Sequence, residues 1–400
     1  MSTEHHPLQD DWIFHPQTVS FVGFSGLGKT TLICKLIQQL APHYNIAYLK
    51  HDVHRFEMDR EGKDTHAAWQ SGASQVFISD NTHYAWLNQG EPSRTLQDSL
   101  LLNADCVFVE GHKNFPLPKI IFLDPERNIL ALLEGESAAK EPACADANIL
   151  AYVGADRACD DPRLQPYFCR DAIEGIAALI LSYFQQNHAS LPLHGLILAG
   201  GRSRRMGTDK ALLSYEGRLQ LERCHELLQD CCAAVYLSAR VGQFPETLLP
   251  KLPRLYDRFV DFGPLGGILT AMQAQKKVAW LVIACDLPFL DRDTLQDLLQ
   301  GRNPFAMASV LSHTEAFLEP LCCIYEPKIR KRLFAYLANE VYCPQRILKQ
   351  MRVQHIPVQN AHALTNVNAM EDYERALSSE VFATRDSLPQ VSYLEGSQHA

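Results

Sequence analysis

Short apolar runs alternate with stretches of helical periodicity through the first half of the chain. The runs predict strands because they are continuously apolar, and they lie at residues 18–24, 46–50, 75–79, 106–110, 119–123 and 149–154. Apolar residues three or four positions apart predict helices over residues 31–40 and 171–184. Apolar strands that alternate with helices are typical of a parallel sheet covered on both faces. We therefore expect an α/β, doubly wound domain.

A second alternation follows a polar, proline-containing stretch at residues 185–194, which we interpret as a linker. Its predicted strands lie at residues 195–200, 233–239 and 280–286, and its predicted helices at residues 219–230, 265–275 and 293–300. The last twenty residues keep no sustained period and predict a loose C-terminal tail. The pattern therefore predicts two doubly wound α/β domains, at residues 1–190 and 191–400.

The loop after the first predicted strand has a phosphate-binding pattern. Gly23, Gly28, Lys29 and Thr30 match G-x-x-x-x-G-K-[ST] between a strand and a helix. The glycines let backbone N–H groups converge on phosphate oxygens, and the helix N-terminus adds positive potential. Lys29 is expected at the β- and γ-phosphates and the Thr30 hydroxyl at Mg²⁺, with Thr31 also among the nucleotide-binding residues. The pattern predicts a P-loop NTPase-like domain.

A Mg²⁺ ion at this loop needs a nearby carboxylate, and three are candidates. Glu110 ends one predicted strand, Asp105 precedes the same strand, and Asp52 follows another. The sequence leaves the choice among them open.

The loop after the predicted strand at 195–200 is of a different kind. It has neither G-K-[ST] nor G-x-G-x-x-G, so neither a second P-loop nor a dinucleotide fingerprint is expected. Gly200 and Gly201 allow a tight turn and close backbone approach to a base or phosphate. Four cations follow within nine residues, and guanidinium and ammonium groups together suit a polyphosphate: Arg202, Arg204, Arg205 and Lys210.

Two carboxylates are expected beside this basic loop. Asp286 follows the strongly apolar strand at 280–286, and Asp257 follows a shorter apolar stretch. Open α/β sheets bind ligands at the carboxyl ends of their strands, so either residue could meet a metal or a nucleotide there. Asp286 is the preferred Mg²⁺ ligand. The second domain is therefore expected to be Rossmann-like.

Composition narrows the classes of partner. The net charge of −9 over 400 residues disfavours nucleic acid and anionic membranes as general partners. No apolar run approaches the roughly 20 residues of a membrane helix, and no secretory signal opens the chain. The twelve cysteines are irregularly spaced, which is typical of buried thiols in a reducing compartment. We expect a cytoplasmic protein.

Residues 18–180 resemble the MobB-type GTP-binding proteins of molybdenum cofactor biosynthesis. The resemblance depends on the P-loop and on three further motifs, at Lys50–His54, Gly62–Ala73 and Val109–Lys113. It implies a GTP-binding adapter domain. It leaves open whether this domain hydrolyses GTP.

Residues 194–378 resemble the nucleotidyltransferases that complete the molybdenum cofactor, and most closely the MobA-type guanylyltransferases. The pattern L-A-G-G-x-S-x-R-M-G-x-D-K is met from Leu198 to Lys210, and "GPLGGI", "ACDLPF" and "NVN" follow in family order. The resemblance implies that the terminal phosphate of Mo-molybdopterin attacks the α-phosphorus of GTP and displaces pyrophosphate.

The same resemblance assigns roles to residues of the second domain. Asp286 would hold Mg²⁺, and Lys210 and Arg205 would offset charge on the phosphates. Asn366 and Asn368 would face the pterin or the metal. The nucleotide would meet Leu198, Ala199, Gly200, Gly201 and Asp257. One departure is Ser238, because the guanylyltransferases usually have asparagine there.

Three alternatives remain open at this stage. Cytidylyltransferases for the same pterin usually have alanine before the second glycine, so Gly200–Gly201 favours guanine. A sugar-phosphate nucleotidyltransferase would share the same glycine and basic residues. The chain could also be a non-catalytic GTP-binding carrier, although the presence of Lys210 and Asp286 disfavours this. Expected partners are a molybdenum-insertion protein and apo-molybdoenzymes or their chaperones, and a homo-oligomer is possible.

Overall fold

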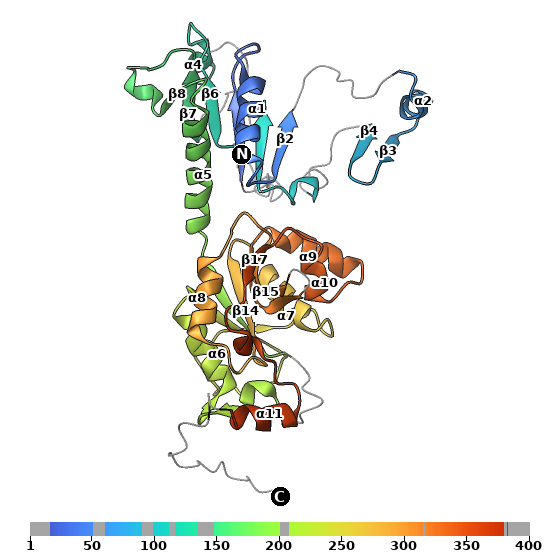
Figure 1. The fold of residues 1–400 in the computed structure, drawn as a ribbon, viewed down its shortest axis with the longest axis vertical. Helices are drawn as coiled ribbons and strands as arrows, with labels where there is room; N and C mark the ends of the chain where they lie inside the picture. The colour runs from blue at the N-terminus through green and yellow to red at the C-terminus, as the bar shows by residue number, and fades with distance from the viewer. Residues whose placement is uncertain are drawn as a thin grey trace, which may run out of the picture. The chain divides into compact units, whose positions relative to one another are not determined.

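The computed structural model describes residues 17–50, 61–89, 99–111, 117–133, 148–200, 208–314, 317–379 and 382. It divides into two compact units, Met1–Tyr183 and Phe184–Ala400, called here the first and second unit (Figure 1). The boundary lies inside helix α5 (Ile173–Ala189). Residues 185–189, which were predicted to begin the linker, therefore belong to this helix. The predicted tail lies outside the described residues, apart from residue 382.

The first unit contains a six-stranded parallel sheet. Its strand order is β2 (Ile46–Lys50), β5 (Cys106–Glu110), β1 (Thr18–Val22), β6 (Lys119–Phe122), β7 (Ile149–Gly154) and β8 (Tyr167–Cys169). Every residue of β1, β5 and β6 is buried, which explains their continuous apolar runs. The unit's helices are α1 (Lys29–Leu40), α2 (Asp64–Gln70), α4 (Asn128–Leu133), the 3₁₀ turn η1 (Pro162–Leu164) and most of α5.

One predicted strand does not join this sheet. β3 (Gln75–Ser79) pairs antiparallel with β4 (Tyr84–Asn88) in a separate hairpin. The turn between them is closed by the Asp80 carboxylate, which accepts hydrogen bonds from the backbone N–H groups of Thr82 and His83. This local turn chemistry favours the hairpin, and the apolar pattern of residues 75–79 alone did not reveal it.

The second unit contains a seven-stranded sheet. The strand order is β13 (Arg254–Tyr256), β12 (Ala234–Ala239), β9 (Leu193–Leu198), β14 (Ala279–Ala284), β16 (Phe317–Tyr325), β15 (Ala308–Thr314) and β17 (Gln354–Pro357). β13, β12, β9 and β14 are parallel, as expected. β16 runs antiparallel to both β14 and β15, so the sheet is mixed rather than wholly parallel.

Helices cover both faces of this sheet. α6 (Gln220–Gln229) and α8 (Arg292–Gln300) contribute Leu221, Leu228, Leu295 and Leu298 to one large apolar core on the sheet. α7 (Pro264–Ala274) packs on the opposite face, and Figure 1 shows α9 (Ile329–Ala338) on that side as well. The second unit is therefore doubly wound around its four parallel strands.

Smaller elements complete the second unit. They are η2 (Lys210–Leu212), the hairpin strands β10 (Ser214–Tyr215) and β11 (Arg218–Leu219), α10 (Pro344–Leu348), η3 (Ala361–Leu364) and α11 (Met370–Leu377). Within the described part of the chain, no helix is long and apolar enough to cross a membrane.

Candidate functional site

A cavity of about 620 Å³ opens at the carboxyl ends of the four parallel strands of the second unit. Its wall includes residues that directly follow β9, β12, β13 and β14, because parallel strands deliver their ends to one edge. The lining residues are Leu198, Ala199, Gly200, Asp209, Lys210, Ser238, Arg240, Asp257, Phe259, Val260, Asp261, Gly263, Pro264, Gly267, Ala284, Cys285, Asp286, Leu321 and Asn368.

One side of the cavity contains an ammonium group between a carboxylate and an amide. Lys210 Nζ donates to Asn368 Oδ1 at 2.6 Å and lies 3.6 Å from Asp286 Oδ2. The amide of Asn366 lies 3.2 Å from both carboxylate oxygens of Asp286 and, with its nitrogen turned toward them, donates to each. The backbone N–H of Val367 donates to the carbonyl of Asp286. Asp286, Lys210 and the Asn-Val-Asn segment are therefore brought together.

Burial sets the electrostatics of Asp286. Its side chain is 19% exposed, and burial raises the pKa of this carboxyl above its ordinary value, although Lys210 opposes the rise. Burial destabilises the ionised form of this carboxyl, and one neighbouring cation offsets only part of that cost. A second positive charge nearby would stabilise the ionised form further. The phosphate-binding role expected for Lys210 and the metal-binding role expected for Asp286 are both compatible with this geometry.

The other side of the cavity is built around Asp257. Ser238 Oγ donates to Asp257 Oδ1 at 2.6 Å, and a side chain at Gly200 would put its Cβ 2.3 Å from Asp257 Oδ2. Burial raises the pKa of the Asp257 carboxyl, and the Ser238 hydrogen bond and the charge of Arg240 oppose the rise. Ser238 thus fixes the orientation of Asp257. A Cβ at Gly267 would lie 2.4 Å from Ser238 Oγ, so α7 closes this corner from behind.

The backbone at the end of β9 is already engaged within the protein. The Leu198 carbonyl accepts from Cys285 N, and the Ala199 N–H donates to the Ser238 carbonyl. The Ala199 carbonyl accepts from Gln243 Nε2 at 2.6 Å. Gly200 is described and lines the cavity. Gly201 and Arg205, both predicted to contact the nucleotide, lie outside the described residues.

Sequence reasoning missed Glu319, a buried carboxylate on β16. Burial raises its pKa to about 7, and the negative charge of Asp286 adds to the rise. The sequence analysis predicted no strand after residue 300, so the neighbour of β14 that bears this residue was not predicted. Among the described residues no group of three or more histidine, cysteine, aspartate or glutamate side chains is placed to hold a metal ion.

The P-loop of the first unit has the predicted local structure. Gly28 has a φ of 84° before α1, and a Cβ at Gly23 would lie 2.7 Å from Phe122 Cβ. Lys29 Nζ donates to the Phe24 carbonyl at 2.7 Å, within its own loop, and burial lowers its pKa. Thr31 is exposed in the first turn of α1. The side chain of Lys29 therefore turns back onto its own loop.

The structure distinguishes among the three carboxylates that the sequence offered as Mg²⁺ ligands in the first unit. Glu110 accepts hydrogen bonds at Oε2 from Thr30 Oγ1 (2.8 Å) and Tyr48 Oη (2.7 Å), and Lys50 Nζ lies 3.7 Å from its Oε1. Asp105 is at the opposite end of β5, where its carboxylate accepts from the backbone N–H of Asn45. Asp52 lies outside the described residues. Glu110 is therefore the carboxylate that meets the P-loop.

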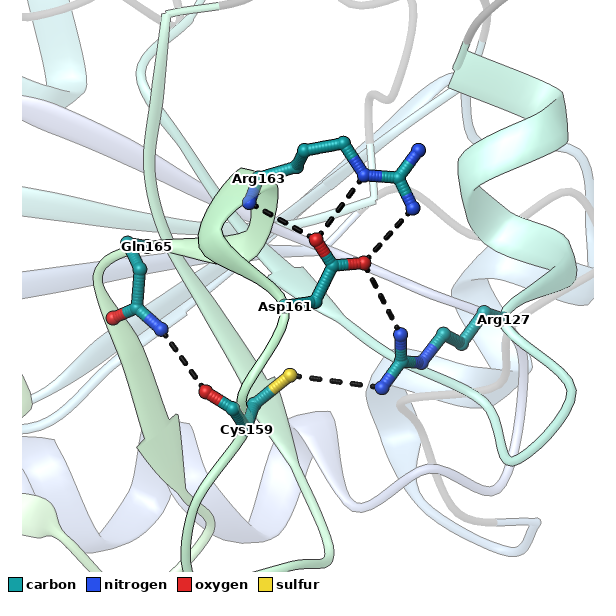
Figure 2. A network of polar contacts seen from close by, with 5 residues as sticks. All are labelled: Arg127, Cys159, Asp161, Arg163 and Gln165. Atoms are coloured by element: carbon teal, nitrogen blue, oxygen red, sulfur yellow. Dashed lines mark hydrogen bonds and ion pairs between the residues drawn. The ribbon is translucent and has the colours of Figure 1, made fainter.

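A second polar network joins the loops that follow β6 and β7 (Figure 2). The Asp161 carboxylate accepts from the guanidinium groups of Arg163 and Arg127, and this lowers its pKa to about 2. Cys159 accepts a long hydrogen bond from Arg127, and its carbonyl accepts from Gln165. Asp161 also caps η1, so all its acceptor positions serve the fold. We assign this network to loop structure.

The fold and these two sites define a protein with two nucleotide-binding α/β units, one of P-loop type and one of Rossmann-like type. Residues 195–356 match the family model described as MobA-like NTP transferase domain, and residues 18–139 match that of molybdopterin guanine dinucleotide synthesis protein B. The chain belongs to the MobA-like family of nucleotidyltransferases, joined to a MobB domain.

Relatives of known name match one or the other part. A "Molybdenum cofactor biosynthesis bifunctional protein" of Synechocystis sp. is 40% identical over 184 residues, which are 46% of this chain and 53% of that one. A "Probable molybdenum cofactor guanylyltransferase" of Methanosarcina acetivorans is 31% identical over 46% of this chain and 90% of its own. A "Molybdopterin-guanine dinucleotide biosynthesis adapter protein" of Haemophilus influenzae is 37% identical over 26% of this chain and 61% of its own. The chain thus spans about half the length of the Synechocystis protein.

Proposed function

We propose that the second unit transfers GMP from GTP to the terminal phosphate of Mo-molybdopterin and releases pyrophosphate. The observation that supports this most directly is one cavity with two different sides, Lys210 with Asp286 on one and Asp257 with Ser238 on the other. A cationic and metal-binding side suits a triphosphate, and a carboxylate with a neighbouring guanidinium suits a base. Relatives named as probable molybdenum cofactor guanylyltransferases favour the same reaction.

The residues of this chain act by alignment and charge. The terminal phosphate of molybdopterin is already ionised, so its oxygen needs no general base to attack the α-phosphorus of GTP. The bond to the α-phosphorus forms as the bond to pyrophosphate breaks, and Lys210 neutralises the charge that moves onto the leaving group. Arg205 is assigned the same task by family pattern. Asn368 holds Lys210 in place by accepting its hydrogen bond.

Mg²⁺ fits the residues on this side. Asp286 supplies the buried oxygen donor, and Mg²⁺ in such sites takes its remaining ligands from substrate phosphates and water. When bound, the ion would neutralise charge on the reacting phosphates. In the first unit, Thr30 would be the corresponding ligand, beside Glu110.

The first unit is proposed to bind GTP as an adapter through Gly23, Gly28, Lys29, Thr30 and Thr31. Its proposed partners are a molybdenum-insertion protein and apo-molybdoenzymes or their chaperones, and the proposed compartment is the cytoplasm. The domain limits proposed for separate function remain 1–190 and 191–400, close to the division between the two compact units.

The test is nucleotide transfer by the full chain. We expect kcat/KM for GTP with Mo-molybdopterin and Mg²⁺ to exceed that for CTP at least roughly 100-fold, because a site that hydrogen-bonds one base leaves polar groups unpaired with another. Equal use of CTP would indicate a cytidylyltransferase. Transfer to a sugar 1-phosphate instead of molybdopterin would indicate a different nucleotidyltransferase, and absence of all transfer would indicate a carrier.

A further inference from the structure

Arg240 directly follows β12 and lines the cavity. Its backbone is fixed, because Arg240 N donates to Gln243 Oε1 at 2.9 Å. Gln243 in turn donates from Nε2 to the Ala199 carbonyl and to Asp209 Oδ2, both at 2.6 Å. The residue is thus tied to the end of β9 and to the residue that precedes Lys210 (Asp209). These hydrogen bonds fix the backbone from which the Arg240 side chain extends along the cavity wall.

The guanidinium of Arg240 has unused hydrogen-bonding capacity. Its Nε is shielded from solvent and meets no hydrogen-bond acceptor within the part of the chain that the structure describes. A shielded donor without an acceptor is costly, and the cost is larger for a charged group. The positive charge acts on Asp257, which follows the adjacent strand β13. Arg240 and Asp257 are therefore groups of opposite charge that line the same cavity at the ends of adjacent strands.

The order of the strands indicates which part of a bound nucleotide would lie beside Arg240 and Asp257. Lys210 and Asp286, the phosphate side, gather at the end of β14. Arg240 and Asp257 follow β12 and β13, on the other side of β9. Neighbouring strands are about 4.8 Å apart, so β12 lies roughly 10 Å from β14. This is comparable to the separation of a base from its α-phosphate, and the base end of the substrate falls beside Arg240.

We propose that Arg240 determines the base specificity of the second unit by donating two hydrogen bonds to O6 and N7 of guanine. The proposal rests on the function proposed above. Guanine presents two adjacent acceptors at this edge, and the arginine fork matches them; adenine replaces one acceptor by a donor amine. Asp257, beside Arg240 on the same wall, offers acceptors to the N1–H and N2–H groups of guanine, which adjoin O6. Cytosine has no counterpart of the O6 and N7 pair on a purine ring. Its own adjacent acceptors, O2 and N3, lie on a smaller ring next to the glycosidic bond, so they would not reach the same position.

The experiment compares GTP with 7-deaza-GTP, which lacks N7 and keeps O6, the ribose and the phosphates. The full chain is assayed for transfer to Mo-molybdopterin as wild type, Arg240→Gln and Arg240→Lys. We expect the wild type to prefer GTP over 7-deaza-GTP about 10-fold in kcat/KM. Arg240→Gln should lose roughly 10- to 100-fold in kcat/KM for GTP and should use both nucleotides equally.

The split between the kinetic constants distinguishes base reading from a structural role. Contacts to the base are the same in the ground and transition states, so the loss should be in KM, with kcat at saturating GTP changed less than about 3-fold. Arg240→Lys keeps the charge and loses the fork, so it should also lose the preference for N7. Arg218→Gln makes the same chemical change outside the cavity lining and should keep the wild-type ratio.

Two results would overturn the assignment. An Arg240→Gln enzyme that still prefers GTP over 7-deaza-GTP as strongly as the wild type would show that Arg240 does not contact N7. A variant that loses kcat alone would show that Arg240 serves the phosphates. In both cases wild-type transfer from GTP would leave the proposed function standing, whereas a wild type that uses CTP in preference to GTP would overturn both.

Discussion

The side chain of Asp286 is mostly buried and its pKa is raised. Its ionised carboxylate therefore lowers the stability of the fold, although the proposed reaction needs that charge. A carboxyl whose pKa is higher in the folded state than in the unfolded chain costs stability once the pH passes its unfolded value. The folded protein keeps the residue, and Lys210 and Asn366 surround it with donors. Such a cost is expected where a residue serves a ligand rather than the fold.

Asp286→Asn should therefore reduce transfer and leave stability intact. The amide has the same volume but no charge, so we expect kcat to fall roughly 100- to 1000-fold. The thermal midpoint at pH 7.5 should equal or exceed that of the wild type, because the buried charge is gone. Single-turnover transfer and differential scanning calorimetry measure the two effects. Near-normal transfer at saturating Mg²⁺ by the folded variant would refute the metal assignment and make Asp257 the next candidate.

Glu319 makes stability depend on pH in a predictable direction. Burial raises its pKa from 4.5 to about 7. Between these values the unfolded chain loses the proton and the folded protein keeps it, so the stability that this residue contributes falls as the pH rises. Glu319→Gln should remove this fall. Relative to the wild type, we expect the variant to gain up to about 3 kcal/mol between pH 5 and pH 8.

The measurement for Glu319 is urea unfolding of both proteins across that pH range, in the presence of EDTA. Glu374→Gln, on the exposed face of α11, is the matched control and should show no such trend. A difference between wild type and Glu319→Gln that stays constant from pH 5 to pH 8 would contradict the prediction.

Single residues were predictable where a strand end and a motif coincided. The sequence singled out Asp286, Lys210 and the P-loop residues because a glycine-rich turn or an isolated acid after an apolar run leaves few local alternatives. The structure places Asp286 and Lys210 together, and the roles of all these residues stay predictions. Arg240 and Glu319 were not identified, because their roles depend on which strands lie side by side. The bond from Ser238 to Asp257 crosses 19 residues and could not be read from spacing.

At the level of elements, the last turn of α5 belongs to the second unit. The ring of His188 lies 5.4 Å from that of Phe305, and Phe184 lies 6.4 Å from it on the same helix. Both residues of α5 are buried, and burial lowers the pKa of His188 to about 4. The stretch interpreted as a polar linker therefore contributes to a core.

A fragment of residues 184–400 should be more stable than one of residues 191–400. The shorter fragment exposes Phe305 and loses the burial of Phe184, and each buried aromatic side chain contributes about 2 kcal/mol. We expect its thermal midpoint to be lower by several degrees, measured by circular dichroism. Equal midpoints for the two fragments would show that the end of α5 adds nothing to this core.

Elements were predictable where apolar runs were continuous and were missed where the runs were short or interrupted. β1, β5, β12 and β14 have nearly the predicted limits, since strands buried on both faces leave an uninterrupted signal. β4, β15 and β16 were missed. In β16 the apolar run is interrupted by Glu319 and Pro320.

For the whole molecule, each unit has a candidate site of its own. The proposed groups are Lys29 and Glu110 in the first unit and Lys210 and Asp286 in the second. Lys29→Ala should therefore abolish GTP binding by the first unit and leave kcat/KM for guanylyl transfer within about 2-fold of wild type. Binding stoichiometry by calorimetry should fall from two to one. Loss of transfer in this variant would mean that the first site controls the second.

The corner formed by Gly200, Asp257, Ser238 and Gly267 limits how the enzyme could be redesigned. No side chain can be added at either glycine without displacing Ser238 or Asp257, and a longer residue at 238 would collide with α7. A laboratory selection for a new nucleotide should therefore yield few productive single mutants at these four positions. Substitutions at these four positions must be introduced together. Arg240, which lines the same cavity, is the position at which we expect a single substitution to change nucleotide preference first.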